Sequence, residues 1–524
     1  MISIDLTYNK GYKWFGKEYR LFVKGFIFDK EEHLLRGEDL LNYFSAIDSF
    51  DEFKNKLSEA NGIYSVIIQK ENSIWAAIDP ARNFPLFYYQ DEKNFYITDN
   101  PDTFRKHNIP FEIDKDSEII FTYSGFTSKH KTLLKNISQL VAGECILVQD
   151  NKVKHEFHTQ FLTNTFTNKT RTELKEELKK ALDGVGKRMV QVLDNRPVAI
   201  PLSGGYDSRL VAYLLRKNNY SNVICFTYGF NDCIELDNAR KTADNLNYEF
   251  YLSDYEKQKE IKLSEDSLYL EYVDFATNYS FRLEDQDYFA VKELKEINKL
   301  SPDTIFIPGH SGAIAGHLLS QDMGNDDFSF VNHALTNVFS LVYPQKKELK
   351  IIEKEIRFLD EKQSAYPPYL VYENWRYQTT TALAFNSSRI WEFFGFEYLI
   401  PLWDKALYNF FMQVPLEHKY DKNLFKETLS ELFEEYSISF LKQEIEPSKR
   451  TIKRVALNHK IKNAFPFLKR FVNPDKLDTI GARYYLSTLI KELKDSGSYR
   501  KYLNLNGVLS AWYIMKLKEK LRKK

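Results

Sequence analysis

The sequence predicts an α/β protein in two parts: a β-rich N-terminal domain, and a second domain built on a doubly wound parallel sheet with a helical C-terminal part. Three patterns carry this prediction. Short apolar runs broken by polar or Gly/Pro clusters fill the first part. Apolar runs and helical patterns then alternate along the chain. Beyond about residue 330, apolar positions recur every three or four residues, which is typical of packed helices.

Strands are expected in the N-terminal domain wherever a short apolar run lies between turn-forming clusters. Because strand and turn patterns fill about the first 160 residues and a polar stretch follows them, we assign residues 1–162 to this domain. The clearest runs are IYSVIIQ (63–69), SIWAAID (73–79), LFYY (86–89), NFYITD (94–99) and ECILVQ (144–149).

A linker is predicted over residues 163–170, which are polar and lack periodicity. Thr170 and Glu173 then form a capping-box pattern. Apolar residues from Leu174 to Leu193 follow at helical spacing. A long amphipathic helix therefore opens the second domain, which we place at residues 171–524.

Three strand-and-turn units build the predicted parallel sheet. The first is RPVAIPLSGGYDSRLVAYLLRK (196–217), in which an apolar run, a Ser-Gly-Gly turn and a helix follow one another. The second has VICFTYG (223–229) as strand and ELDNARKTADNLN (235–247) as helix. The third is the strand TIFIPG (304–309), which ends in a glycine-containing turn. Alternating strands and helices favour a doubly wound sheet.

The turn from Ser203 to Ser208 has the composition of an anion-binding loop. Gly204 and Gly205 let the backbone bend tightly, and the N–H groups of the next helix's first turn point outward. The helix dipole adds to this, and the two serines supply hydroxyl donors. An acidic Asp207 beside a phosphate site makes sense if Mg²⁺ lies between the two anions. The alternative is that this stretch is an ordinary turn in which Asp207 only caps the following helix.

Several motifs together resemble the asparagine synthetase family. The sequence P-L-S-G-G-Y-D-S resembles the pyrophosphate loop of the adenylating N-type ATP pyrophosphatases, and of this family in particular. The other motifs that carry the resemblance are N-G-I-Y-S (61–65), I-D-P-A-R-N-F-P-L-F-Y-Y (78–89), L-V-A-G-E (140–144), P-G-H-S-G (308–312) and R-I-W-E-F-F-G-F-E-Y-L-I-P-L-W-D (389–404).

This resemblance implies a fold and a reaction. The N-terminal domain would be an Ntn-hydrolase-like αββα sandwich, and the second domain an adenine-nucleotide-alpha-hydrolase-like synthetase. A carboxylate would attack the α-phosphate of ATP, pyrophosphate would leave, and an amine would displace AMP to form an amide. The residues implied to bind ATP are Leu202, Ser203, Gly204, Gly205, Asp207, Ser208, Thr227, Tyr228 and Gly309, with Asp207 also holding Mg²⁺.

The sequence departs from the family pattern at its start. The family's glutaminase uses a cysteine as the first residue after methionine removal, whereas position 2 is Ile2. Cys145, Cys225 and Cys233 are all far from the N-terminus. We therefore expect no glutamine hydrolysis, so that this domain would serve as a scaffold or docking surface. The spacing of the cysteines also argues against a zinc site or a disulfide framework.

A second departure lies at positions 310 and 313. Asparagine synthetases carry Glu where His310 stands, and a metal-binding Asp where Ala313 stands. His310 is a candidate base for the attacking amine, with a structural hydrogen-bonding role as the alternative. Asp232, Glu235 or Asp322 could replace the missing metal ligand. His317 is expected to pack on a helix.

The family also uses a late lysine that neutralises charge on the α-phosphate and the tetrahedral intermediate. Lys449 suits this catalytic role best, with Lys442 and Lys453 as alternatives. The alternative is that all three lysines are solvent-exposed surface residues without a catalytic role.

The charge balance limits the partners. The chain has 73 basic and 73 acidic residues among 524, which argues against a nucleic-acid binder. We expect a cytoplasmic protein without a membrane span, acting on ATP with a small-molecule or peptide carboxylate and an amine donor. A homodimer or a biosynthetic partner protein is left open. The alternative function is a nucleotide-binding pseudoenzyme or scaffold of the same family.

Overall fold

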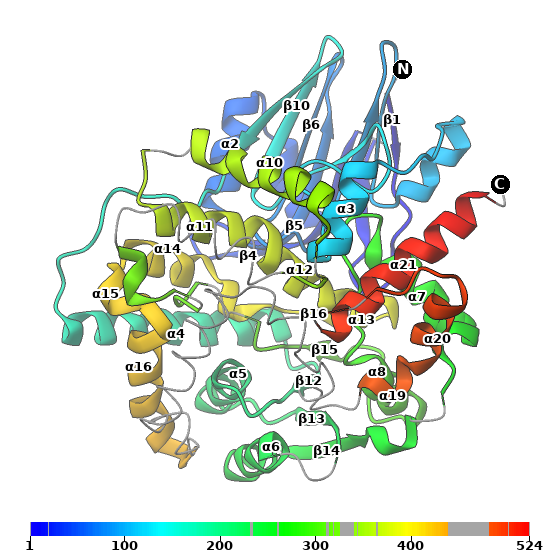
Figure 1. Ribbon diagram of the computed structural model, residues 1–524. Helices are drawn as coiled ribbons and strands as arrows, with labels where there is room; N and C mark the ends of the chain where they lie inside the picture. Colours follow the sequence, from blue (N-terminus) through cyan, green and yellow to red (C-terminus); the bar gives the residue numbers. More distant parts are fainter. Residues whose placement is uncertain are drawn as a thin grey trace.

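The computed structural model describes residues 2–18, 20–230, 234–258, 261–310, 314–317, 319–324, 340–342, 344–362, 365–438, 482–500, 502 and 504–522. Two β-sheets stand in the upper half of the molecule, and a third sheet with most of the helices forms the lower half (Figure 1). Among the described residues, no helix is both long enough and apolar enough to cross a membrane.

The N-terminal domain is a sandwich of two sheets. One has strand order β1-β8-β7-β9, and the other has order β11-β10-β6-β5-β3-β2 with β4 also paired to β3. The expected strand runs thus coincide with real strands. The strands are β1 (Ile2–Asp5), β2 (Trp14–Lys17), β3 (Leu21–Phe28), β4 (Leu34–Arg36), β5 (Asn61–Gln69), β6 (Ser73–Ile78), β7 (Phe87–Gln90), β8 (Phe95–Thr98), β9 (Ile137–Gln139), β10 (Glu144–Gln149) and β11 (Lys152–Phe157).

Helices cover both outer faces of this sandwich. The inner faces share one buried apolar layer that includes Ile67, Ile97 and Ile146. Helices α1 (Glu38–Ser45) and α2 (Phe50–Glu59) close the larger sheet through a second apolar cluster. The 3-10 segment Pro101–His107 and α3 (Lys115–Ser124) place apolar side chains against the other sheet. This layering confirms the expected αββα fold.

The second domain is built on five parallel strands in the order β14-β13-β12-β15-β16. The chain runs outward from β12 to β14 and then returns to the other side of β12, so the sheet is doubly wound, as expected. The switch point lies between β12 and β15. The strands are β12 (Val198–Pro201), β13 (Val223–Gly229), β14 (Glu249–Asp254), β15 (Ile305–Phe306) and β16 (Glu397–Tyr398).

The helices of this domain follow the predicted order. Helix α4 (Arg171–Leu193) begins with the expected capping box: the Thr170 hydroxyl accepts from Glu173 N–H, and the Glu173 carboxylate accepts from Thr170 N–H. The helices nearest the sheet are α5 (Tyr206–Lys217), α6 (Ile234–Asn245), α7 (Ser267–Thr277) and α8 (Tyr288–Glu296). The predicted strand 304–309 is shorter than expected, because only Ile305 and Phe306 pair with neighbours.

The C-terminal part is helical, as expected. Its last helix, α21, lies against α3 of the N-terminal domain (Figure 1). The described helices are α10 (Lys346–Lys362), α11 (Pro368–Arg376), α12 (Ala382–Phe385), α13 (Arg389–Phe393), α14 (Lys405–Gln413), α15 (Leu416–Lys419), α16 (Asn423–Phe433), α19 (Ala482–Tyr485), α20 (Ser487–Asp495) and α21 (Leu505–Arg522), with a π-helical turn at Tyr377–Thr381.

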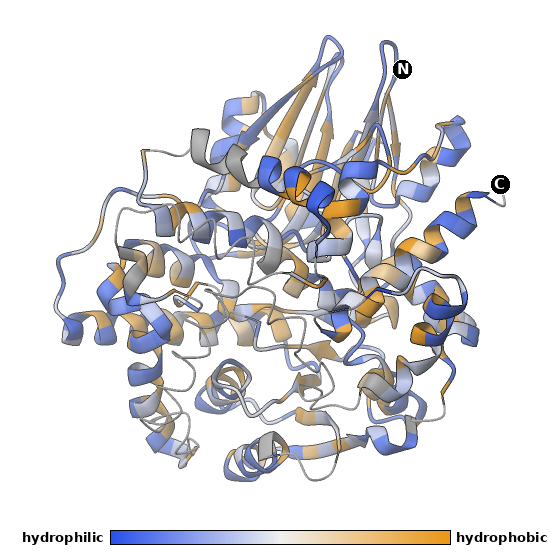
Figure 2. Cartoon of the chain, in the orientation of Figure 1, coloured by the Kyte–Doolittle hydropathy of each residue, from blue (hydrophilic) through white to orange (hydrophobic). Residues whose placement is uncertain are grey.

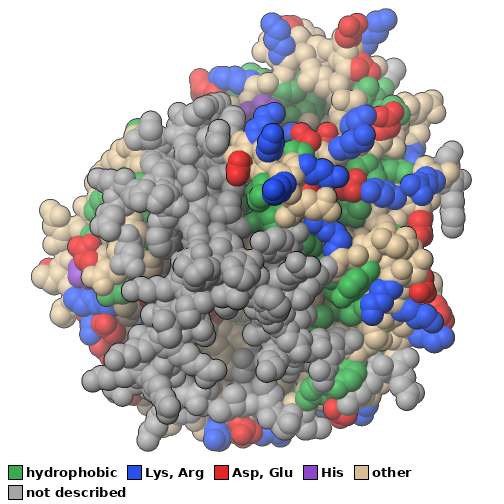
Figure 3. Space-filling model, viewed as in Figure 1, with side chains coloured by type: hydrophobic (Ala, Val, Ile, Leu, Met, Phe, Trp, Pro, Cys, Tyr) green, Lys and Arg blue, Asp and Glu red, His purple; other side chains and the backbone are tan. Residues whose placement is uncertain are grey.

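The two domains pack into one body. A single apolar cluster contains side chains of both, and apolar residues concentrate on the strands and inward helix faces (Figure 2). The buried Lys24 ammonium of β3 donates to Glu392 of α13 at 2.6 Å, and Glu392 also pairs with Arg389 at 2.7 Å. On the described part of the face in Figure 3, basic and acidic side chains are interspersed.

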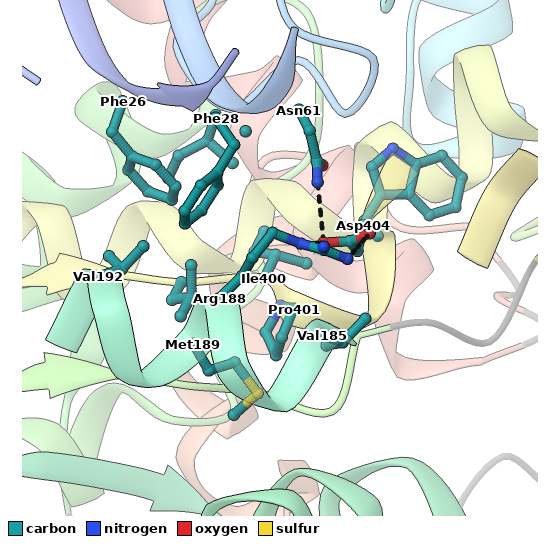
Figure 4. Close-up of a pocket in the computed structure, with 14 residues that line it drawn as sticks. Phe26, Phe28, Asn61, Val185, Arg188, Met189, Val192, Ile400, Pro401 and Asp404 are labelled. Carbon is teal, nitrogen blue, oxygen red and sulfur yellow. Dashed lines mark hydrogen bonds and ion pairs between the residues drawn. The ribbon is translucent and has the colours of Figure 1, made fainter. Parts of the chain in front are cut away.

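A second seam contact centres on Asp404, the N-cap of α14. Arg188 of α4 donates to both Asp404 oxygens, at 2.7 and 2.8 Å. Asn61 of β5 donates to the same carboxylate at 3.0 Å and accepts from the N–H of Lys405 at 2.9 Å (Figure 4). Asp404, like Glu392 in the first contact, therefore helps to hold the domains together.

Candidate active site

The Ser203–Ser208 turn lies at the carboxyl end of β12, next to the topological switch point of the sheet. This edge is where doubly wound folds bind ligands. The hydroxyl of Ser203 accepts from Gly205 N–H at 3.2 Å, and the Ser208 hydroxyl accepts from Ser203 N–H at 3.1 Å. These local bonds form the turn before α5 begins at Tyr206. The first N–H groups of α5 therefore face the edge of the sheet.

Asp207 lies in the first turn of α5 and has an unevenly satisfied carboxylate. Its Oδ2 pairs with the Lys422 ammonium at 2.8 Å. Its Oδ1 is buried and accepts no hydrogen bond from any described residue. A buried carboxylate oxygen without a donor is costly, and such an atom in a native fold calls for an explanation.

Gly309 packs directly on this turn. A Cβ at this position would lie 2.3 Å from Ser208 N and 2.6 Å from the Asp207 carbonyl carbon. Both are backbone atoms, so the conflict could not be relieved by a side-chain rotation. The segment after β15 and the start of α5 are therefore in contact only because residue 309 has no side chain.

Lys422 is a site residue that sequence reasoning missed. It comes from a turn in which Asp421 and Lys422 both have left-handed backbones, with φ of 51° and 57°. Bulky residues rarely adopt this conformation, and such strained positions are concentrated at functional sites. No local sequence signal announces it, because the turn carries no glycine and the site forms only when the C-terminal helices pack on α5.

A second contact holds the same region together. The backbone of Gly316, with φ of 87°, lies so close to Lys419 that a Cβ would meet the Lys419 carbonyl oxygen at 2.1 Å. The Arg376 guanidinium donates to the carbonyl of His317. The turn after β12, the segment after β15 and the start of α16 thus meet at one place. Contrary to the packing expected for it, the His317 side chain is exposed.

His310 lies beside this loop and is held neutral at pH 7. Its Nε2 is 2.7 Å from the Ser387 hydroxyl, and its ring lies stacked at 6.1 Å from that of Trp391. Burial lowers the pKa of His310 to about 4, although the nearby Asp207 carboxylate acts in the opposite direction. A group with this pKa is a weak base near neutral pH.

A cavity of about 190 Å³ adjoins His310. Burial raises the pKa of Asp287 to about 6, and Tyr228 donates to this carboxyl. Glu284 pairs with Arg282 at 2.6 Å. The lining is therefore acidic on one side and apolar on the other. The lining residues are Tyr228, Glu284, Gln286, Asp287, His310, Ala384, Ser387 and Ile390.

The other expected site residues divide into two groups. Leu202 is buried directly after β12, and Thr227 and Tyr228 end β13 beside it. Lys449, its alternatives Lys442 and Lys453, and the positions Asp232 and Ala313 lie outside the described residues. The side chains of Glu235 and Asp322 lie outside them as well.

The described cysteines of the chain are unsuited to nucleophilic catalysis. Cys145 and Cys225 are both fully buried. Burial raises the pKa of Cys145 to about 12 and that of Cys225 still higher. Neither forms a thiolate near neutral pH. Ile2 lies in β1, with its side chain against the apolar layer between the sheets.

Comparison with known proteins identifies part of the second domain. Residues 173–270, which run from α4 through the loop and β14 into α7, match the family model for asparagine synthase. A search of curated proteins returned no match.

Solved structures show only weak overall likeness. An allosteric regulatory enzyme of purine biosynthesis is 12% identical with a TM-score of 0.20, covering 47% of this chain, and the chain spans 63% of that enzyme. The NH3-dependent NAD synthetase from Campylobacter jejuni is 18% identical with a TM-score of 0.22, over 42% of this chain and 96% of that one. The glutamine PRPP amidotransferase from B. subtilis is 12% identical with a TM-score of 0.18, over 66% and 70%.

The matched residues contain the loop, Asp207 and strands β12 and β13, whose ends flank the loop, whereas Gly309, His310 and Lys422 lie outside the match. Residues 173–270, the part of the second domain that carries the loop, are thus similar to the asparagine synthase family.

Proposed function

We propose that the chain is an ATP-dependent, AMP- and pyrophosphate-forming amide ligase. It would adenylate a carboxylate and couple it to an amine, without hydrolysing glutamine. One observation carries the proposal: a buried Asp207 oxygen has no described partner, beside an N-terminal helix turn at the switch point of the sheet. This arrangement suits a metal-bound polyphosphate.

The donor set at the loop fits Mg²⁺. Magnesium is held in such sites by one or two carboxylates together with phosphate oxygens, and Asp207 presents a free oxygen of this kind. When bound, Mg²⁺ would neutralise charge on the departing pyrophosphate. The backbone N–H groups of Gly204 and Ser208 would hold the pyrophosphate oxygens, and the Gly205 N–H, which donates to the Ser203 hydroxyl, would turn to them together with that hydroxyl. Leu202, Thr227 and Tyr228 would border the nucleoside, with Gly309 allowing the close approach.

Two lysines are candidates for balancing negative charge. Lys422 is 10% exposed and already contacts Asp207, so its ammonium could reach a phosphate oxygen without crossing the site. Lys449 keeps the catalytic role that the family resemblance gives it, as a proposal. Charge stabilisation of this kind is often a large catalytic contribution.

His310 would orient the attacking amine. The neutral ring can accept a hydrogen bond from a neutral amine through the nitrogen not engaged by Ser387. Its low pKa makes it a weaker base than the amine itself, so we assign it positioning before proton removal.

The cavity beside His310 favours an amine-bearing substrate. Asp287 and Glu284 line it, whereas the Arg282 guanidinium is taken up by Glu284. The negative charge of the lining would repel a substrate carboxylate that entered the cavity, whereas it would attract a substrate ammonium group. In this proposal the amine would occupy the cavity, and the carboxylate would approach from the loop.

The absence of glutamine hydrolysis rests on the cysteines. Neither described cysteine is accessible or ionised, and the position that carries the family's nucleophile is an apolar strand residue. Free ammonia or a substrate amine would then serve as nucleophile.

A nucleotide-binding pseudoenzyme is the second candidate. The Lys422–Asp207 ion pair favours it, because a lysine that already neutralises this aspartate lowers the affinity for a cation there. This candidate predicts ATP binding without turnover.

Substrate-dependent pyrophosphate release separates the two. The full chain would be assayed with ATP, Mg²⁺ and panels of carboxylates and amines, with glutamate production measured in parallel. Release that Asp207→Asn abolishes and Asp183→Asn preserves supports the ligase. Asp183 is a matched control because it also pairs with a lysine, Lys217 at 2.7 Å, but lies on the exposed face of α4. ATP binding with no release under any condition supports the pseudoenzyme.

A further inference from the structure

We propose that His130, Glu144 and His155 form a binding site for a divalent transition-metal ion, Zn²⁺ first, in the N-terminal sandwich. The proposal is independent of the ligase function, because the cluster lies between the two sheets of the sandwich and uses none of the loop residues. Among the described residues it is the group of histidine and carboxylate side chains whose ligand atoms converge, all within 4.8 Å of one another.

Two imidazoles approach the same carboxylate oxygen. His130 Nε2 lies 2.8 Å and His155 Nδ1 lies 2.7 Å from Glu144 Oε1, and the two ring centroids are 4.3 Å apart. His155 comes from β11, Glu144 begins β10, and His130 lies in the turn before β9 of the opposite sheet. Three separate segments thus deliver nitrogen and oxygen ligands to one point.

The Glu144 carboxylate is held in a fixed position. Glu144 is fully buried, and its Oε1 faces both imidazoles. Its other oxygen, Oε2, accepts from Val141 N–H at 2.8 Å. This bond fixes the carboxyl plane while Oε1 faces the histidines.

An outer partner is in place for one imidazole. His155 Nε2 lies 3.3 Å from the Tyr88 hydroxyl of β7. In the metal-free chain Nδ1 donates to Glu144, so metal binding would place the imidazole proton on Nε2, where the Tyr88 hydroxyl can accept it, and leave the Nδ1 lone pair for the ion. Metal-bound histidines nearly always have such an outer hydrogen bond.

The spacing suits a first-row ion after a small adjustment. Zn–N and Zn–O bonds of about 2.0–2.2 Å at tetrahedral angles place ligand atoms about 3.3 Å apart. The two N···O distances would each lengthen by roughly half an ångström from their hydrogen-bonded values. His130 and His155 are 33% and 29% exposed, which leaves one side of the cluster open to water as a fourth ligand. Two histidines and one carboxylate favour Zn²⁺ over Mg²⁺, which prefers oxygen.

An occupied site would tie the domain to its neighbour. The turn that carries His130 also contacts α10 of the second domain, through Ser128 and Lys131, which reach the two oxygens of Glu355 at 2.5 and 3.3 Å. A metal joining this turn to β10 and β11 would therefore stabilise both the sandwich and this contact.

The test measures metal binding by the full-length chain after removal of bound metal with a chelator. Zn²⁺ would be titrated in competition with a chromophoric chelator, and Co²⁺ would be added separately as a spectroscopic probe. We expect about one equivalent of Zn²⁺ with sub-micromolar affinity, intense visible bands of four-coordinate Co²⁺, and a higher melting temperature with Zn²⁺ but not with Mg²⁺. His130→Ala and His155→Ala should each abolish this binding, and Tyr88→Phe should weaken it by about tenfold.

His107→Ala is the matched control. His107 Nε2 also contacts a carboxylate, Asp5, at 2.8 Å, but no second histidine joins that pair. It should leave Zn²⁺ binding unchanged. Equal binding by wild type and both ligand variants, or none by a wild type shown to be folded by circular dichroism, would overturn the proposal. The cluster would then be a hydrogen-bonded triad only.

Discussion

Two carboxylates, one in each domain, show how the surroundings of an acidic side chain determine what it can bind. Glu144 of the sandwich has both oxygens occupied, one by two histidines and the other by a backbone N–H. Asp207 of the second domain has one oxygen paired with Lys422 and the other without any described partner. The first has a nitrogen-rich environment suited to a transition metal, whereas the second faces helix N–H groups suited to phosphate and Mg²⁺.

This difference separates the roles of the domains. The second domain presents its unsatisfied group at the edge of a parallel sheet, where a substrate can complete it. The sandwich buries its described cysteine and the Glu144 carboxylate, which fits the prediction that this domain serves as a scaffold. The following experiments perturb one domain at a time, from the largest expected effect to the smallest.

Gly309→Ala should have the largest effect, and on the second domain alone. The added Cβ would lie 2.3 Å from Ser208 N, so the loop or the start of α5 must move. We expect pyrophosphate release to fall by more than about 100-fold, because displacements near 1 Å have effects of this size. Gly184→Ala is the control, because a Cβ there would lie 3.4 Å from the Arg188 guanidinium, an ordinary van der Waals distance. Full activity of Gly309→Ala would show that the close packing of residue 309 on Ser208 is not needed for the reaction.

Acid should destabilise the sandwich through His158. Burial lowers the pKa of His158 to about 4, and its Nε2 donates to the Ile78 carbonyl. The folded pKa lies below the unfolded value of about 6.5, so the neutral form's stabilisation is complete above about pH 6.5 and is lost as pH falls toward 4.

The expected loss at His158 is about 3 kcal/mol across this window. Asp79, whose pKa burial raises to about 6, acts in the opposite direction, so the histidine must be isolated by comparison. The comparison is the free energy of unfolding in urea, measured for wild type and His158→Phe at pH 7 and at pH 4.5. A parallel decline of the two proteins would show that His158 is not responsible.

Lys422→Met should weaken the nucleotide site moderately. Removing the ammonium leaves Asp207 unpaired and takes a cation from the phosphates. We expect kcat/KM for MgATP to fall by about 10–30-fold, or about 2 kcal/mol. Lys426→Met is the control, because the partner of Lys426 in the described part of the chain is the exposed Asp421, at 3.6 Å. If the Lys422→Met variant is instead more active than wild type at low Mg²⁺, then Lys422 competes with the metal for Asp207, as the pseudoenzyme candidate requires.

Asn61→Ala should have the smallest effect, at the seam between the domains. The variant loses one hydrogen bond to Asp404 and one from Lys405 N–H. The free energy of unfolding should decrease by about 1–2 kcal/mol, since each net hydrogen bond contributes about 1 kcal/mol. Ser58→Ala removes only an exposed local bond to Asn55 and is the control. Equal unfolding curves for the two variants would show that this contact does not join the domains.

Local patterns predicted most of the fold. The strand runs, the capping box at Thr170 and the alternation around the loop each depend on neighbouring residues, so the sequence displays them directly. The loop with Asp207 was predictable for the same reason.

The remainder of the site depends on contacts between distant segments. Lys422 reaches Asp207 through a left-handed turn without glycine, and Gly309 matters because of a backbone contact about 100 residues away in sequence. The His130–Glu144–His155 cluster combines three segments of two sheets. Such arrangements have no fixed spacing, and periodicity carries no information about them.

The most direct test of the central claim is Mg²⁺-dependent pyrophosphate release from ATP by the purified chain, supplied with carboxylate and amine substrates. The account predicts release that requires both substrates, disappears when Mg²⁺ is removed or Asp207 is changed to Asn, and proceeds without glutamate formation from glutamine. Tight ATP binding with no release across the substrate panels, or release unaffected by Asp207→Asn, would contradict it.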